Sequence, residues 1–142
     1  MLDELNMIDN RPNLTGIMNL DTSDMQGSHW VVFQINKPSG NLYYVDPLGI
    51  KINPVPKEIK RLAKMKNLEL VYNKNQLMPT YSNFCGYISI YLAKLFRRAL
   101  KESKVITKDK FFKIVYKAFG HKPSDDKMDK LFRWAKKFKI IS

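Results

Sequence analysis

Three side chains of the types used in nucleophilic catalysis stand at the ends of expected secondary-structure elements. Cys85, the one cysteine of the chain, is followed by Gly86 and begins an apolar stretch that predicts a helix. A thiol at a helix N-terminus lies near the positive end of the helix dipole, which favours the reactive thiolate. Gly86 leaves room for the backbone of a substrate. A lone cysteine is by itself more often a small buried apolar residue, so this position alone indicates little.

His29 and Asp46 favour a catalytic interpretation of the thiol. His29 begins an expected strand over residues 29–35, and Asp46 ends a second expected strand over residues 42–46. The connection over residues 36–41 contains proline and glycine and is short enough to join an antiparallel pair. The beginning of the first strand then lies beside the end of the second. We therefore expect the carboxylate to orient the imidazole, as in catalytic triads.

The rest of the chain supplies the elements that must hold these residues. Apolar spacing and turn residues predict one further strand and four helices. The strand covers residues 68–72, and the helices cover residues 56–66, 85–100, 108–119 and 125–138. Thr107 and Ser124 are suitable N-caps for the last two helices, and Gly120 is a natural helix stop. The first ten residues read as a short helix or a loose tail, and residues 14–20 as a short apolar run.

Length and composition limit the class of protein. The chain has 142 residues, enough for one core, and its 44% hydrophobic and 12% aromatic content argues against overall disorder. We expect no membrane span, because no apolar run reaches about 20 residues. The acidic first ten residues do not resemble a secretory signal. One cysteine excludes an internal disulfide and a cysteine-rich zinc site, and with no carboxylate cluster we expect no metal in a reducing, intracellular setting.

The positive charge is concentrated towards the C-terminus. Residues 1–85 contain 9 Lys or Arg and 8 Asp or Glu, a net charge of +1, whereas residues 86–142 contain 16 and 5, a net charge of +11. Such a field attracts phosphate polymers or acidic partners, although a lysine-rich helix can also be only a solvated surface. We expect a non-specific nucleic-acid-binding face that includes the following lysines: Lys113, Lys117, Lys136, Lys137 and Lys139.

Four segments, in their order along the chain, resemble one enzyme family. They are GSHWVV at residues 27–32, YYVDPLG at residues 43–49, Gln76, and SNFCG at residues 82–86. The chain thereby resembles the adenovirus-type (adenain-like) maturation cysteine proteases, in the version found in virophages and polinton- or adintovirus-like elements. These enzymes are related to the SUMO-deconjugating proteases. The tripeptide NLD at residues 19–21 adds to a likeness that extends over residues 14 to about 98.

The resemblance implies a role for each residue of the expected site. His29 is the general base, Asp46 orients it, and Cys85 is the nucleophile that forms a thioester. Trp30 forms a wall of the substrate cleft. His121, next to a helix end, is expected to be a cap or a surface residue.

The group that stabilises the oxyanion is less sharply defined. The resemblance assigns this role to Gln76, which stands nine positions before the cysteine, a looser spacing than the family leads us to expect. Asn75, Asn83 or backbone N–H groups near the cysteine are alternatives.

The resemblance also implies a fold and a function. We expect an α+β fold with a papain-like core of the adenain and SUMO-protease type, in which a small mixed or antiparallel sheet packs on the cysteine-bearing helix. This core would cover residues 1–102, with a basic helical hairpin appended over residues 103–142. The expected substrates are viral capsid or core precursor proteins in the virion or at its assembly site, with no cofactor except DNA as a candidate activator.

Two other functions remain open on the sequence alone. One is the removal of a ubiquitin-like or SUMO-type modifier by the same site. The other is a non-catalytic DNA- or virion-binding module on a protease scaffold. A disulfide-tethered activating peptide is not expected, because the tether would consume Cys85, the one cysteine.

Overall fold

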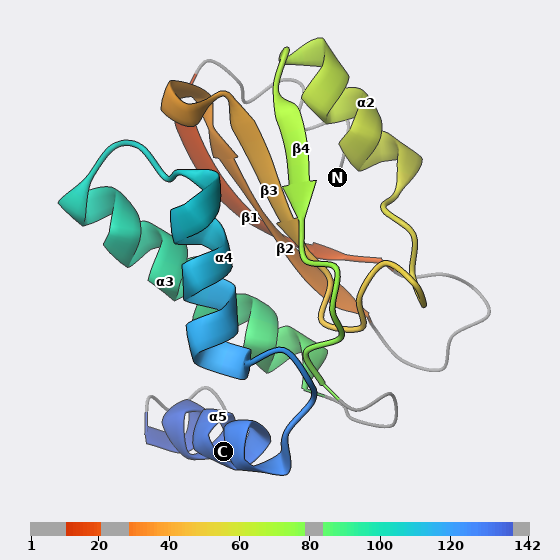
Figure 1. Ribbon diagram of the computed structural model, residues 1–142, viewed down its shortest axis with the longest axis vertical. Coiled ribbons are helices and arrows are strands. Elements are labelled where there is room, and N and C mark those ends of the chain that lie inside the picture. Colours follow the sequence, from red (N-terminus) through yellow and green to blue (C-terminus); the bar gives the residue numbers. More distant parts are fainter. Residues whose placement is uncertain (1–10, 21–28, 79–83, 138–142) are drawn as a thin grey trace.

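A four-stranded sheet with helices on both faces forms the centre of the computed structural model, which describes residues 11–20, 29–78 and 84–137 (Figure 1). The strands are β1 (Asn13–Asn19), β2 (Trp30–Asn36), β3 (Asn41–Val45) and β4 (Glu69–Tyr72). They lie in the order β1-β2-β3-β4, with β1, β2 and β3 antiparallel and β4 parallel to β3. The predicted α+β class, with a small mixed sheet, is confirmed.

The two central strands are buried on both faces of the sheet. Along β3, successive side chains alternate between two hydrophobic clusters, with Tyr43 and Val45 in one and Leu42 and Tyr44 in the other. This alternation follows from the period of two in an extended chain. A sheet whose two faces are both covered needs apolar residues at consecutive positions, and Leu42 to Val45 provide them.

Helices cover both faces of this sheet. On one face lies α2 (Lys57–Met65), which buries Ile59, Leu62 and Ala63. On the other lies α3 (Cys85–Glu102), whose buried residues include Ile88, Leu92 and Phe96. A short 3-10 helix, η1 (Lys37–Ser39), forms the turn of the β2–β3 hairpin. The helices predicted over residues 56–66 and 85–100 and the predicted β-hairpin are therefore present, whereas the short helix or tail expected over residues 1–10 lies outside the described residues. No helix in the described ranges is long and apolar enough to cross a membrane.

The two C-terminal helices share the core of α3. They are α4 (Lys108–Phe119) and α5 (Asp125–Lys137), and both lie against α3 in Figure 1. Phe111 of α4 stacks on Tyr43 of β3 with ring centroids 4.6 Å apart. Leu131 of α5 belongs to the same buried cluster. The hydrophobic packing is therefore continuous on both sides of residue 102, after which the sequence analysis placed a domain boundary.

The connection between α3 and α4 is also bonded to the sheet. The side chain of Asn36 donates to the carbonyl of Lys104 (2.9 Å) and accepts from the N–H of Ile106 (3.0 Å). The hydroxyl of Tyr43 donates to the carbonyl of Ile106. The predicted N-cap Thr107 then accepts a hydrogen bond from the N–H of Lys110 (3.2 Å). These bonds fix where α4 begins.

The strand β1 is the element that the sequence did not predict. Its residues were expected to be only a short apolar run, but they pair antiparallel with β2 from Asn13 to Asn19. Gly16 in its middle lies under the ring of Phe33, where an added Cβ would come within 2.2 Å of Cζ. A glycine within a strand weakens the local strand signal, and here the packing of a cross-strand aromatic ring provides the reason for it.

Candidate active site

A tight turn after β3 holds the carboxylate of Asp46. The N–H of Gly49 donates to the carbonyl of Asp46 (2.9 Å), which closes a four-residue turn. The N–H of Leu48 donates to the carboxylate oxygen Oδ1 (2.9 Å). Asp at the first position and Pro47 at the second favour this geometry. Gly49 has φ of 79°, and an added Cβ would lie 3.3 Å from the backbone of Asn75. Both conditions favour glycine there.

Asn73, which the sequence patterns did not single out, fixes the backbone of Asp46. Its carboxamide accepts from the N–H of Asp46 (3.0 Å) and donates to the carbonyl of Asp46 (2.8 Å) and to that of Asn75 (2.9 Å). Asn73 is fully buried. It follows β4 as Asp46 follows β3, and the ends of parallel strands meet at one edge of the sheet. A prediction that these two strands are parallel would have revealed this residue.

The side chains of His29 and Asp46 meet at this edge. The imidazole nitrogen Nε2 lies 2.8 Å from Oδ1 of the carboxylate, and both side chains are buried, with 3% and 0% exposed. The other carboxylate oxygen, Oδ2, is buried and has no hydrogen-bond partner in the described part of the chain. The proximity expected from the β2–β3 hairpin is therefore present in the structure.

The thiol of Cys85 completes the group from the first residue of α3. Burial lowers the pKa of His29, but hydrogen bonds to Asp46 and Cys85, together with the charges of both partners, outweigh it and raise this pKa to about 9. Burial also raises the pKa of the thiol, but the hydrogen bond to His29, those from the backbone of Trp30 and Gly86, and the charge of His29 lower it below its ordinary value. Both shifts favour the charged pair of thiolate and imidazolium over the neutral pair.

Trp30 and Gly86 lie next to the thiol. Trp30 begins β2 and is half-buried, and a Cβ added to Gly86 would lie 3.4 Å from its atom Cδ1. The indole therefore flanks the first turn of α3. This position is compatible with the expected cleft wall, while the contact of Trp30 with the buried cluster also gives it a packing role.

Gln76 lies in a loop that is attached to the turn of Asp46. The N–H of the next residue, Leu77, donates to the carbonyl of Pro47 (2.8 Å). The carboxamide nitrogen of Gln76 donates to the carbonyl of Met78 (2.6 Å). The side-chain amide of Asn75, an alternative oxyanion donor, donates a hydrogen bond to the carbonyl of Gly120 at the end of α4 (3.2 Å). Asn83 lies outside the described residues. The identity of the oxyanion donor stays a prediction.

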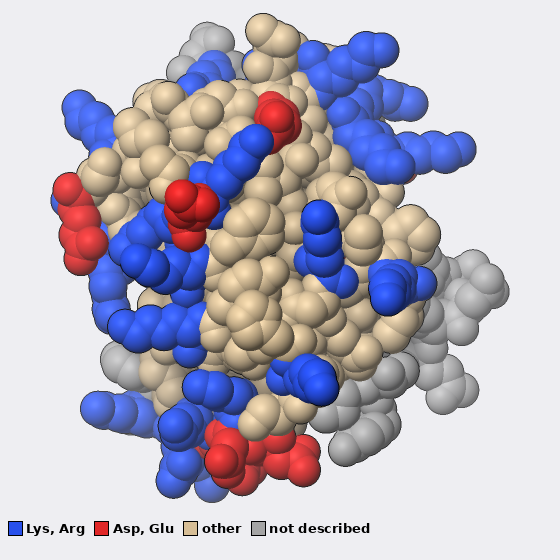
Figure 2. All heavy atoms as spheres, viewed as in Figure 1, with Lys and Arg blue, Asp and Glu red and all other residues tan. Residues whose placement is uncertain are grey.

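Basic side chains are spread over the face of the molecule that Figure 2 shows, with uncharged surface between them. Lys113 and Lys117 on α4 and Lys136 and Lys137 at the end of α5 are exposed. Lys139 lies outside the described residues.

A second basic group, which the net charge of the first half concealed, lies on α2 and consists of Lys57, Lys60, Arg61 and Lys64. The first half of the chain is nearly neutral in sequence because several of its acidic residues lie in segments 1–10 and 21–28.

Two further features of the sequence analysis concern His121 and the binding of metal ions. His121 is exposed and its ring lies 4.1 Å from that of Tyr116, so its expected surface position is confirmed. Among the described residues, no group of three or more His, Cys, Asp or Glu side chains could hold a metal ion.

No family model matches this sequence, and a search of curated proteins finds no relative. The geometry at the sheet edge is therefore the main indication of function.

Proposed function

We propose that this protein is a cysteine hydrolase that cleaves peptide bonds, with Cys85 as nucleophile, His29 as general base and acid, and Asp46 as the group that orients the imidazole. The observation that carries the proposal is the buried His29–Asp46 contact of 2.8 Å together with the hydrogen bond between His29 and the thiol at the beginning of α3. A purely structural cysteine needs neither a charged partner nor a lowered pKa.

The reaction follows from the positions of these atoms. The thiolate attacks the substrate carbonyl carbon, and the negative charge moves to the carbonyl oxygen. The C–N bond then breaks while His29 donates a proton to the leaving amine, which leaves a thioester on Cys85. His29 next removes a proton from water as the water oxygen attacks the thioester carbon. The C–S bond then breaks, which releases the acid and restores the thiolate of Cys85 beside the imidazolium. Because Nε2 is held by Asp46, Nδ1 is the nitrogen that exchanges the proton.

The resemblance to maturation proteases narrows the substrate to viral capsid or core precursor proteins. A processing enzyme of this kind works beside packaged DNA, and the exposed lysines of α4 and α5 can contact phosphates without reading bases. We include non-specific DNA binding by these helices in the proposal. Its role is to keep the enzyme near its substrates in the virion or at the assembly site.

An electrophilic thiol probe tests the catalytic proposal directly. The full chain is treated at neutral pH with a peptidyl vinyl sulfone, and labelling is followed by mass spectrometry. We expect Cys85 to be labelled in the natural chain and labelling to be at least about tenfold slower in His29→Ala, since the imidazolium stabilises the thiolate. The chain offers a matched control, His121→Ala, which should react normally because that ring is exposed at the end of α4.

Cleavage is tested with a peptide library and with the capsid precursor encoded in the same genome. Cys85→Ala and His29→Ala should each abolish cleavage. Equal labelling of the natural chain and of His29→Ala, with no cleavage by either, would contradict an active thiol and support the binding-module alternative. Selective labelling by a probe with a ubiquitin-like modifier and a C-terminal Gly-Gly electrophile would instead support deconjugation.

A further inference from the structure

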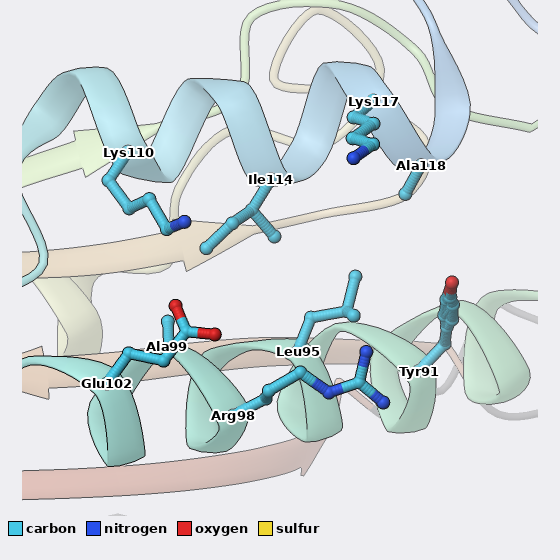
Figure 3. A pocket seen from close by; sticks show the side chains of 9 residues that line it. All are labelled: Tyr91, Leu95, Arg98, Ala99, Glu102, Lys110, Ile114, Lys117 and Ala118. Carbon is cyan, nitrogen blue, oxygen red and sulfur yellow. The ribbon is translucent and has the colours of Figure 1, made fainter.

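A groove between α3 and α4 combines an aliphatic floor with a basic rim (Figure 3). Its volume is about 350 Å³. In Figure 3, Ile114 points from α4 towards α3, and Leu95 points from α3 towards α4. Both are only partly buried, so their apolar surface remains accessible in the groove. The groove contains none of the three residues of the candidate active site.

The charges around this floor are mostly of one sign. Arg98 projects from α3, and Lys110 and Lys117 project from α4, while Glu102 is the one acidic residue in the lining. None of the three cations forms an ion pair with any residue in the part of the chain that the structure describes. Three such cations around an aliphatic floor fit an occupant that carries both carboxylates and aliphatic side chains.

The groove continues towards α5. A second hollow, of about 170 Å³, shares Tyr91, Lys117 and Ala118 with the first and adds Lys127 and Lys130 to its lining. Trp134 of α5 lines it as well, with the ammonium group of Lys94 lying 5.5 Å from the ring centroid. The basic rim with an apolar floor is therefore longer than one hollow.

The length of the groove sets the size of its occupant. Lys110 and Lys117 are seven residues apart on one helix, which corresponds to about 10 Å at roughly 1.5 Å per residue. An extended peptide rises about 3.3 Å per residue, so this part of the groove accommodates about three residues. A hollow of about 350 Å³ with an aliphatic floor suits a peptide better than duplex DNA, whose phosphates lie on a wide convex surface.

We propose that this groove between α3 and α4 binds an acidic peptide segment of a partner protein, with a leucine or isoleucine of that segment seated between Leu95 and Ile114. Carboxylates on either side of the aliphatic anchor contact Arg98, Lys110 and Lys117. The site does not depend on the chemistry of Cys85. A Cys85→Ala chain should therefore bind the peptide as the natural chain does, whatever the outcome for hydrolysis.

The test measures binding of a labelled peptide by fluorescence anisotropy. The probe is fluorescein-Glu-Asp-Leu-Asp-Ile-Asp-Glu, and the full chain is titrated into it at low salt. The double variant Arg98→Glu/Lys110→Glu should weaken binding by at least about tenfold, because two attractive interactions become repulsive. The control Lys60→Glu/Lys64→Glu changes the net charge equally on α2, which covers the opposite face of the sheet, and should change binding by less than about twofold.

The aliphatic part of the proposal is tested first by changing the probe and then by changing the floor of the groove. A second probe has serine in place of leucine and isoleucine and should bind several-fold more weakly. Leu95→Ala, with its fold checked by circular dichroism, should reduce the difference between the two probes. Equal binding of both probes, or equal losses in the two double variants, would overturn the proposal in favour of unspecific charge attraction. Absence of peptide binding combined with loss of duplex-DNA binding in Arg98→Glu/Lys110→Glu would also overturn it and assign the groove to DNA.

Discussion

The candidate active site and the surface of the C-terminal helices use polar residues in opposite ways. At the sheet edge, a few polar groups are buried, and His29 and Asn73 each bond Asp46 at a defined distance. On α4 and α5, many exposed charges surround aromatic residues that pack inward. A buried polar group without its partner is costly, whereas an exposed lysine is individually worth little. Single substitutions should therefore disable the sheet edge, and only combined substitutions should alter the helical surface.

Asp46→Asn should have a large effect on catalysis, second only to the abolition expected for Cys85→Ala and His29→Ala. The amide preserves the shape but cannot stabilise an imidazolium, so kcat should fall by up to about 10⁴-fold. In the natural chain, activity should rise with pH as Cys85 ionises below the usual pKa of a thiol and fall as His29 loses its proton near its pKa of about 9. In the variant the alkaline limb should move to lower pH. A pH–rate profile with an unmoved alkaline limb would contradict the role of Asp46.

Phe111→Ala tests how far the C-terminal helices belong to the core. The ring is fully buried between Tyr43 and Phe96, with centroids 4.6 Å and 5.9 Å away. Its removal should lower the free energy of unfolding by about 3–5 kcal/mol, measured by urea denaturation. Phe132→Ala on α5 is the control, since that side chain is 39% exposed and its removal should cost less than about 1 kcal/mol. If both variants lowered the free energy of unfolding by the same small amount, α4 would not be part of the core.

Gln76→Ala should lower kcat by about 10²-fold if its carboxamide stabilises the oxyanion. Binding of the peptide substrate in the ground state should change little, so the decrease should appear in kcat rather than in KM. An unchanged kcat would transfer the role to Asn75, Asn83 or backbone N–H groups at the beginning of α3.

Charge reversal on α5 should have a moderate effect that depends on salt. Lys136→Glu/Lys137→Glu should weaken binding of a 20-base-pair duplex and lower the slope of log affinity against log salt by about 0.9 for each phosphate that is no longer neutralised. Hydrolysis of a short free peptide should stay near normal, because neither lysine belongs to the group of Cys85, His29 and Asp46. Duplex binding that does not depend on salt, or no binding at low salt, would leave these lysines as a solvated surface.

Gly86→Ala should have the smallest effect on stability. An added methyl group would make ordinary contact with Trp30 at 3.4 Å, and alanine is the better helix former. The free energy of unfolding should therefore rise by no more than about 1 kcal/mol. Turnover of a peptide should nevertheless fall several-fold if the substrate backbone passes over this position. Full activity in a stable variant would place the cleft elsewhere.

Local sequence patterns determined most of the elements and one essential contact. The β-branched and aromatic runs and the short turn defined the β2–β3 hairpin, and that hairpin brings residue 29 to the end of the sheet where residue 46 lies. Thr107 and Gly120 marked the ends of α4 because caps act within one helical turn. The segment YYVDPLG likewise contained the turn that holds Asp46. All of these features depend on neighbours close in sequence.

Only the tertiary structure decided the features that depend on pairing between distant segments. The parallel pairing of β4 with β3 placed Asn73 against Asp46, and the pairing of β1 with β2 made a strand of a weak apolar run. The burial of Phe111 against Tyr43 joined α4 to the core, and the packing of α4 on α3 created the groove. Periodicity shows which face of an element is apolar, but the partner of that face is selected by the burial of the whole chain.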